Sequence, residues 1–175
     1  MMEEYIIPLN GLPVGKKSFS WHAGQEFFGR FDNADILDAD LSVEVMVEKS
    51  GTFIGVDCSL EGTLTVPCDR CLEDLRLPVR AEVRLRAKPG EGVPEVETEG
   101  GREVVFYSVE DGILDLSQTI YDYALLALPL QRVHEEGLCN PDAVKHLGRG
   151  SVESNKPEGQ INDSPFAALK GLLGN

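Results

Sequence analysis

Apolar and polar residues alternate with a period of two through the middle of the chain, from Leu41 to Ala87. Such alternation predicts strands with one buried face and one solvent-exposed face. Turn-forming residues interrupt the run at 49–52, 61–62 and 68–71, so we expect antiparallel strands joined by short connections. The clearest alternating positions are Leu75, Leu77, Val79, Ala81, Val83, Leu85 and Ala87.

The period is lost after Ala87. Residues 88–101 combine proline and glycine with several glutamates, which predicts a mobile acidic loop. The apolar run from Val104 to Tyr107 predicts one more short strand.

Helical spacing begins at Asp115. This residue and Gln118 form a start similar to a capping box, and the apolar residues that follow predict a helix over about 116–128. Pro129 ends that helix.

The pattern of the first forty residues does not decide their secondary structure. Tyr5, Ile7 and Leu9 alternate like a strand, whereas the phenylalanine-rich segment 25–32 is compatible with helical turns or with another strand.

The expected architecture is a single β-rich α+β domain over residues 1–147, with an antiparallel sheet and one main helix. Strand patterns do not distinguish an open sheet from a barrel. The composition of residues 148–175 predicts a flexible linker followed by a short amphipathic helix over 166–173. Ser164 and Pro165 would start that helix.

Charge narrows the range of partners. The 175 residues include 16 Lys and Arg against 30 Asp and Glu, which gives a net charge of −14. Generic binding to a phosphate backbone is disfavoured, because each phosphate contact needs a cation. A basic protein is the better electrostatic match.

The sequence also indicates a compartment. No apolar run reaches the ~18–20 residues that span a bilayer, so no membrane partner is expected. The acidic start Met1–Tyr5 lacks the features of a secretory signal, which predicts a cytoplasmic protein. In a reducing cytosol, cysteines serve as core thiols, metal ligands or redox groups.

The most specific local motif is Cys68-Asp69-Arg70-Cys71. Flanking strands place it at a hairpin corner, which disfavours a thioredoxin-type centre at a helix N-terminus. A zinc site would need two further ligands, and His134 and Cys139 are the candidates for a structural Cys3His site. The alternative is that the cysteines pack as small apolar residues, as the pattern indicates for Cys58.

No catalytic motif is complete. The segment Gly11–Ser18 resembles a phosphate-binding loop, but only three residues separate its glycines and Lys17 follows Lys16, so a solvent-exposed loop is expected. No serine or cysteine lies in a nucleophile elbow, and we therefore predict a protein that is not an enzyme.

One basic stripe departs from the acidic average of the chain. Arginines along one strand face, together with Arg70, could contact RNA or an acidic protein. The alternative is pairing across the sheet with residues such as Glu44 and Glu48. Direct contact with RNA stays open. The stripe consists of Arg76, Arg80, Arg84 and Arg86.

Three separated blocks of the chain carry a family resemblance: residues 62–73 with the Cys-Asp-Arg-Cys-Leu core, residues 126–130 and residues 163–170. Together they resemble the YceD family of large ribosomal RNA subunit accumulation proteins. The resemblance implies a bacterial cytoplasmic protein needed for normal accumulation of large-subunit ribosomal RNA, and it implies no catalytic activity. Many members carry a cysteine cluster after the Leu-Pro block. In this chain His134 takes the first of those positions and only Cys139 remains.

The resulting hypothesis is a non-enzymatic factor for large-subunit biogenesis that binds a basic ribosomal protein or a precursor particle. The apolar residues of the C-terminal segment would anchor it. The alternative is a small zinc-binding or thiol-redox protein that uses Cys68 and Cys71. The anchoring residues would be Phe166, Leu169, Leu172 and Leu173.

Overall fold

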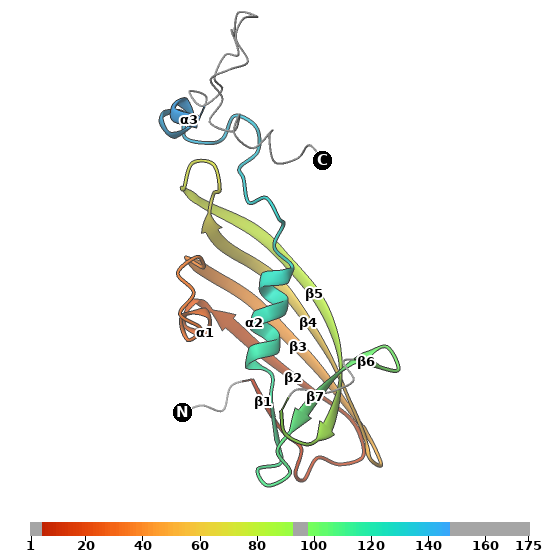
Figure 1. Cartoon of the computed structure of the whole chain (residues 1–175). Coiled ribbons are helices and arrows are strands. Elements are labelled where there is room, and N and C mark those ends of the chain that lie inside the picture. Colours follow the sequence, from red (N-terminus) through yellow and green to blue (C-terminus); the bar gives the residue numbers. More distant parts are fainter. Residues whose placement is uncertain (1–4, 93–97, 148–175) are drawn as a thin grey trace, which may run out of the picture. The chain divides into compact units, whose positions relative to one another are not determined.

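The computed structural model describes residues 5–92 and 98–147. The chain divides into two compact units, Met1–Asn140 and Pro141–Asn175. The first unit contains nearly all of the described secondary structure (Figure 1). Its elements are β1 (Ile6–Pro8), β2 (Gly15–Gly24), α1 (Gln25–Gly29), β3 (Asp38–Ser50), β4 (Phe53–Pro67), β5 (Asp74–Pro89), β6 (Thr98–Glu99), β7 (Arg102–Tyr107), β8 (Ile113–Asp115) and α2 (Ser117–Leu126).

A six-stranded sheet in the order β2-β3-β4-β5-β7-β6 forms the main layer, and β1 pairs with β8 in a separate two-stranded ribbon. All pairings in the large sheet are antiparallel except that of β5 with β7, which is parallel. The predicted β-rich α+β fold is confirmed. Among the described strands the sheet stays open, because β2 and β6 lie at its two edges and are not paired with each other.

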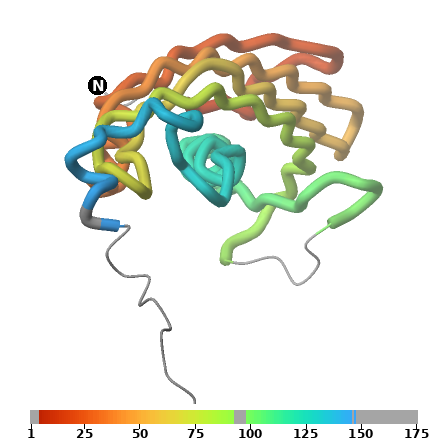
Figure 2. The backbone as a smooth tube through the Cα atoms, turned by 90° about the horizontal axis from the view of Figure 1, so that it is seen from above, coloured from red at the N-terminus to blue at the C-terminus, as the bar shows by residue number. Residues whose placement is uncertain are grey.

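The sheet is strongly curved and wraps around α2. Viewed along the helix, the strands follow an arc with α2 on its concave side (Figure 2). The inward residues of β3, β4 and β5 meet Ile120 and Ala124 of α2, and both of these helix residues are fully buried. Burial of apolar area at this face, at about 25 cal/mol per Å², is the main force that holds sheet and helix together.

Aromatic side chains of and around α1 pack against this core. Phe31 stacks on Tyr121 of α2 with ring centroids 4.1 Å apart. Tyr5 packs against Phe27 of α1 at 4.7 Å, and its hydroxyl donates a hydrogen bond to the carbonyl of His22. The segment 25–32, which the sequence left open, therefore begins as the short helix α1.

The predicted corner at 61–62 is wrong, because β4 runs without a break from Phe53 to Pro67. Gly62 has a φ of +156°, and a Cβ at this position would lie 2.0 Å from the carbonyl oxygen of Asp40 on β3. Glycine is present here because two backbones approach closely, and the chain does not turn.

The corners at 49–52 and 68–71 are confirmed as the β3–β4 and β4–β5 connections. The strand predicted at Val104–Tyr107 is confirmed as β7. Strand β2 was not predicted, and Gly15–Ser18 belong to it. Residues 11–14 form a loop, in which Leu12 is buried and the other three residues are exposed, so the expectation of a solvent-exposed loop holds only in part.

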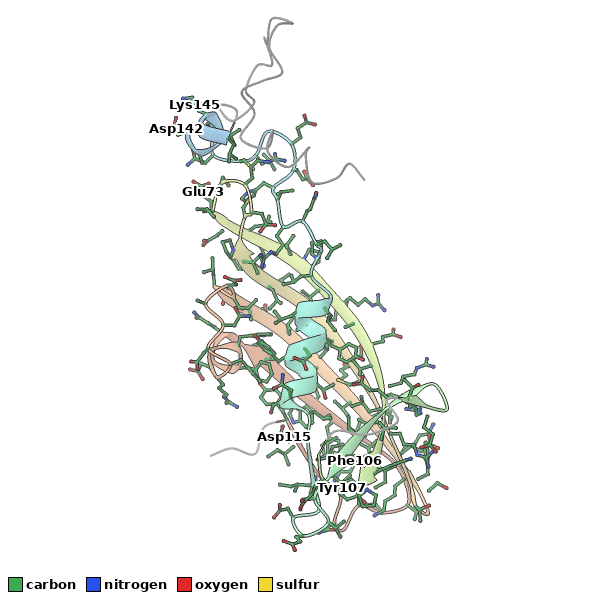
Figure 3. All side chains as sticks on the ribbon, in the orientation of Figure 1. Glu73, Phe106, Tyr107, Asp115, Asp142 and Lys145 are labelled. Atoms are coloured by element: carbon green, nitrogen blue, oxygen red, sulfur yellow. The ribbon has the colours of Figure 1, made fainter. Side chains whose placement is uncertain are left out.

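Helix α2 begins within one residue of the prediction and ends before Pro129. The Asp115 carboxylate accepts the backbone N–H of Ser117 at 2.8 Å, whereas the Gln118 side chain donates to Asp122 further along the helix. The start therefore uses the predicted acidic residue but is not a reciprocal capping box. Asp115 lies at the base of the helix (Figure 3).

The described part of the second unit is α3 (Pro141–Leu147), which the sequence pattern did not predict. Within α3, Lys145 and Asp142 form an exposed i,i+3 ion pair at 2.8 Å (Figure 3). The predicted linker and C-terminal helix lie outside the described residues, and the predicted boundary after residue 147 stays a prediction. None of the helices described, in either unit, is both long and apolar enough to cross a membrane.

Candidate metal centre

The turn between β4 and β5 holds two cysteines on a tight backbone scaffold. The N–H of Cys68 donates to the carbonyl of Glu73 at 2.8 Å, and the N–H of Leu72 donates back to the carbonyl of Cys68 at 2.9 Å. Leu72 has a φ of +63°, in the left-handed region that a tight reversal requires. The N–H of Arg70 also donates to the Cys68 sulfur at 3.5 Å, so the turn directs a backbone dipole at this thiol.

A second segment, residues 127–140, leaves the end of α2 and reaches this turn (Figure 1). We call it the strap. Asp69 holds it through the backbone of Arg132: the Asp69 N–H donates to the Arg132 carbonyl at 2.7 Å, and the Arg132 N–H donates to the Asp69 carboxylate at 2.7 Å. The Asn140 amide donates to the Glu73 carboxylate at 2.7 Å, and Figure 3 shows Glu73 at the tip of the turn.

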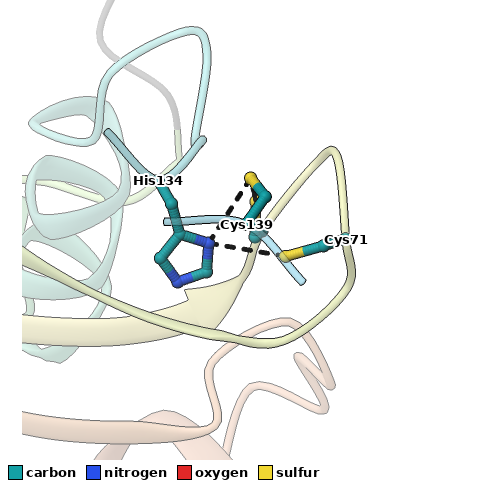
Figure 4. Close-up of side chains that lie close together, drawn as sticks. Cys71, His134 and Cys139 are labelled. Carbon is teal, nitrogen blue, oxygen red and sulfur yellow. Dashed lines mark hydrogen bonds between the residues drawn. The ribbon is translucent and has the colours of Figure 1, made fainter. Parts of the chain in front are cut away.

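The strap brings His134 and Cys139 beside Cys71 (Figure 4). Cys68 belongs to the same cluster. One donor atom from each of the four residues lies within 4.8 Å of all the others. The three cysteines are buried, all three are free thiols, and His134 is half-buried.

Three of the distances between donor atoms match the edges of a tetrahedron around a small metal ion. The sulfurs of Cys68 and Cys139 lie 3.9 Å apart, and Nδ1 of His134 lies 3.4 Å from the Cys71 sulfur and 3.9 Å from the Cys139 sulfur. Zinc bonds of about 2.3 Å to sulfur and about 2.0 Å to nitrogen give tetrahedral edges of about 3.8 Å between sulfurs and about 3.6 Å between sulfur and nitrogen.

The His134 ring is held so that Nδ1 faces the sulfurs. Its other nitrogen, Nε2, lies 3.1 Å from the carbonyl of Asp74 at the start of β5. A carbonyl can only accept, so in the neutral ring Nε2 carries the proton and Nδ1 has a lone pair that faces the sulfurs. Histidine ligands of metals are oriented in the same way by an acceptor at the second ring nitrogen.

The thiols differ in their electrostatics. Burial raises the pKa of Cys68, but the N–H groups of Arg70, Cys71 and His134 outweigh burial and lower that pKa to about 6. The Cys68 side chain raises the pKa of His134, and burial together with the neighbouring sulfurs raises the pKa of Cys139. Burial alone raises the pKa of Cys58, in the sheet core, to about 12.

Comparison with protein families gives one match. The profile described as "Large ribosomal RNA subunit accumulation protein YceD" covers residues 56–173, more than half of the chain. The chain belongs to the YceD family. Searches of curated proteins and of solved structures return no match.

The YceD match includes all four residues of the cluster, together with β5, α2 and the strap. It begins within β4 and therefore leaves β1, β2 and β3 outside. The matched segment thus contains the whole cluster.

The fold therefore brings together the four residues that the sequence predicted as candidate metal ligands. That they bind zinc is not tested by this geometry and stays a prediction. The hairpin setting of the Cys-x-x-Cys motif is confirmed, since β4 and β5 flank it and no helix begins there.

The basic stripe of this YceD protein lies on the outer face of β5, and its ends are paired. Arg76 donates to Thr63 at 3.0 Å and lies 3.9 Å from the Asp40 carboxylate. Arg86 and Lys88 both pair with Glu99. Within the described structure, Arg80 and Arg84 have no ion pair, and Arg70 lies exposed in the β4–β5 turn.

Pairing of the stripe across the sheet is found for Arg76 with Asp40 of β3 and for Arg86 with Glu99 of β6. Among the described residues no ion pair joins the stripe to Glu44 or Glu48. Glu48 instead lies 4.0 Å from Lys16 of β2. The predicted anchor residues of the C-terminal segment lie outside the described residues.

Sequence reasoning did not find the residues that support the cluster. Asp69, Glu73 and Asn140 are common surface residue types, and their role depends on partners more than sixty positions away. The position of Asp69 inside the Cys-x-x-Cys motif was the one available signal, because the residues of such a turn lie close to whatever the motif binds.

Proposed function

We propose that this protein is a non-enzymatic factor for the accumulation of large-subunit ribosomal RNA, and that it acts by binding a basic ribosomal protein or a precursor particle. The observation that carries the proposal is the family match over residues 56–173, which includes the cluster, the strap and α2. The description of that family names the accumulation of large-subunit RNA.

Charge supports a protein partner over bare RNA. At a net charge of −14, the chain repels a polyanion at long range and attracts a polycation. The one basic stripe is partly neutralised, because Arg86 shares Glu99 with Lys88 and Arg76 lies near Asp40.

The surface that fits a basic partner best is the end of the first unit where the turn and the strap meet. We call residues 69–74 and 135–138 the tip. Two leucines there are exposed, Leu72 to 78 % and Leu138 to 66 %. A basic segment with apolar residues on one face matches this combination of exposed leucine and carboxylate. The exposed carboxylates of the tip are those of Asp69, Glu73, Asp74, Glu135 and Glu136.

The remaining features agree with this function. The C-terminal residues Phe166, Leu169, Leu172 and Leu173 would supply a second, apolar anchor on the partner. We propose a cytoplasmic location, where ribosomal subunits are assembled. The family description names an accumulation protein and no catalytic activity, which supports the proposal of a role without catalysis.

A second candidate is a thiol-redox protein, which the proximity of three thiols favours. The Cys-x-x-Cys turn lies between strands and lacks the helix N-terminus that stabilises a reactive thiolate in thioredoxin-type centres. Backbone N–H groups stabilise the Cys68 thiolate without such a helix, so the lowered pKa of Cys68 fits either role, and the convergence of four donor atoms favours the structural one.

The first test is in cells of the source organism depleted of the protein. We expect a lower ratio of large- to small-subunit ribosomal RNA and fewer large subunits in a sucrose gradient. A normal ratio with a normal gradient would contradict the proposed function, whatever the fate of the cluster.

The second test concerns the tip. The Leu72→Ser/Leu138→Ser variant is expected to lose binding to purified large-subunit proteins, and added salt is expected to weaken the wild-type interaction. Val109→Ser is the matched control, because Val109 is 65 % exposed and lies in the β7–β8 connection. Equal binding by the two variants would exclude the tip as the docking surface and leave the cellular role intact.

A further inference from the structure

We propose that Cys68, Cys71, His134 and Cys139 bind one Zn²⁺ ion, which fastens the strap to the β4–β5 turn. The argument starts from the convergence of four donor atoms within 4.8 Å, two from a turn and two from a segment more than sixty residues later. The proposal is independent of the function proposed above.

The donor set selects the metal. Three sulfurs and one imidazole suit zinc, which is borderline-soft and has no geometric preference of its own, whereas magnesium and calcium take oxygen ligands. The carboxylates next to the cluster are engaged elsewhere, that of Asp69 by Arg132 and that of Glu73 by Asn140. Four protein ligands close the tetrahedron, so the site is structural and keeps no open position for a substrate.

The packing of ordinary core thiols does not explain this arrangement. Cys58 shows what a core cysteine of this chain looks like: it lies between Val45 and Val83 on neighbouring strands. Cys71 and Cys139 instead flank the lone-pair nitrogen of His134, whose ring is fixed from behind by the Asp74 carbonyl. Such an outer support is typical of histidine ligands.

A disulfide does not explain it either. The Cys68 and Cys139 sulfurs lie 3.9 Å apart, whereas a disulfide bond is about 2.05 Å. Any one disulfide would also leave the third thiol and His134 without a role. A single metal ion satisfies all four donors at once.

A bound zinc ion would hold the strap in place. The strap consists of turns and bends without regular secondary structure of its own. Its position therefore depends on the Asp69–Arg132 hydrogen bonds, on the Asn140–Glu73 hydrogen bond and on the cluster. Zinc would link the strap to the turn by four bonds. Removing the metal should therefore release the strap while the sheet and α2, which have their own core, stay folded.

The first measurement is the metal content of the untagged full chain, purified without chelator and without a metal-affinity column. We expect one zinc per chain. After removal of the metal, titration with Co²⁺ is expected to saturate at one equivalent with the intense visible absorption of a tetrahedral thiolate site. No stoichiometric metal in the purified chain and no cobalt signal would overturn the proposal, and so would a reversible Cys68–Cys71 disulfide in its place.

Variants assign the ligands. His134→Ala and Cys139→Ser are expected to lose stoichiometric zinc. His134→Cys is expected to keep it, because four cysteines also form a zinc site. The matched control is Cys58→Ala, which removes a buried cysteine outside the cluster and should retain one zinc per chain. If Cys58→Ala lost the metal while Cys139→Ser kept it, the proposed ligand set would be wrong.

Discussion

Asp69 and Arg132 bind each other through both backbone N–H groups: the Asp69 N–H donates to the Arg132 carbonyl, and the Arg132 N–H donates to the Asp69 carboxylate, each at 2.7 Å. The Arg132 guanidinium adds an ion pair to the same carboxylate at 3.3 Å. One residue of the turn thus fixes the direction of the strap two residues before His134. Asp69 is a positioning residue for the cluster and donates no ligand of its own.

Asp69→Ala is therefore expected to loosen the strap. The backbone N–H of Arg132 would lose its acceptor, and because this hydrogen bond is exposed to water the loss costs about 0.5–1.5 kcal/mol. We expect zinc affinity to fall roughly tenfold, as when outer support of metal ligands is removed. Competition with a chromogenic chelator measures the affinity, and thermal unfolding measures the stability.

Two variants sharpen this prediction. Asp69→Asn keeps a side-chain oxygen for the Arg132 N–H and should retain more of the affinity. Glu110→Ala removes an exposed carboxylate in the β7–β8 connection and should change neither quantity. An Asp69→Ala protein that binds zinc like the wild type would exclude the positioning role.

Gly62 is expected to tolerate no side chain. In Gly62→Ala the new Cβ would lie 2.0 Å from the Asp40 carbonyl oxygen, so β3 and β4 would have to move apart. We expect a loss of several kcal/mol, on the order of 3 or more, in the free energy of unfolding. Urea denaturation at equilibrium measures it.

Gly29→Ala is the matched control for Gly62→Ala. A Cβ at Gly29 meets nothing within 4 Å, and its backbone lies outside the left-handed region. Alanine at this position, the last residue of α1, should be neutral or slightly stabilising. Similar stability of the two variants would contradict the close approach of the two strands.

Tyr123 connects α2 to β7 through a 2.6 Å hydrogen bond to the Glu103 carboxylate, and this bond raises the pKa of Tyr123 to about 12. The bond needs the protonated phenol. Its contribution is therefore complete below the unfolded pKa near 10 and is lost as the pH rises from about 10 to about 12.

Tyr123→Phe should accordingly lower the free energy of unfolding by about 1–2 kcal/mol at pH 7. The difference in the free energy of unfolding between this variant and the wild type should shrink above pH 10. Urea titrations at pH 7 and above pH 10 measure this difference. A difference that stays constant would show that the hydroxyl contributes through packing and not through its proton.

Substitutions on the outer face of β5 can distinguish binding of a protein partner from direct binding of RNA. Arg80→Ala/Arg84→Ala removes the two stripe arginines that are without an ion pair in the described structure. With a basic protein as partner, this variant should restore the ratio of ribosomal RNAs in depleted cells as well as the wild type does. A failure to restore the ratio by a stably folded variant would favour RNA contact through the stripe.

Local pattern determined the central strands, α2 and the strand β7, because each follows from the spacing of apolar residues within one element. It was wrong at Gly62, because the sequence alone does not distinguish a glycine that allows two backbones to approach closely from a glycine in a turn. It missed β2, which lies at the sheet edge, where most of its side chains are exposed and little alternation remains.

The sequence by itself determined which residues could bind a metal, because thiols and imidazoles are rare and chemically specific. Only the tertiary structure decided that they meet. The path of α2 along the concave face of the sheet delivers the strap to the turn, and Asp69 holds it there. Such convergence depends on contacts between segments distant in the chain, and no local periodicity records those contacts.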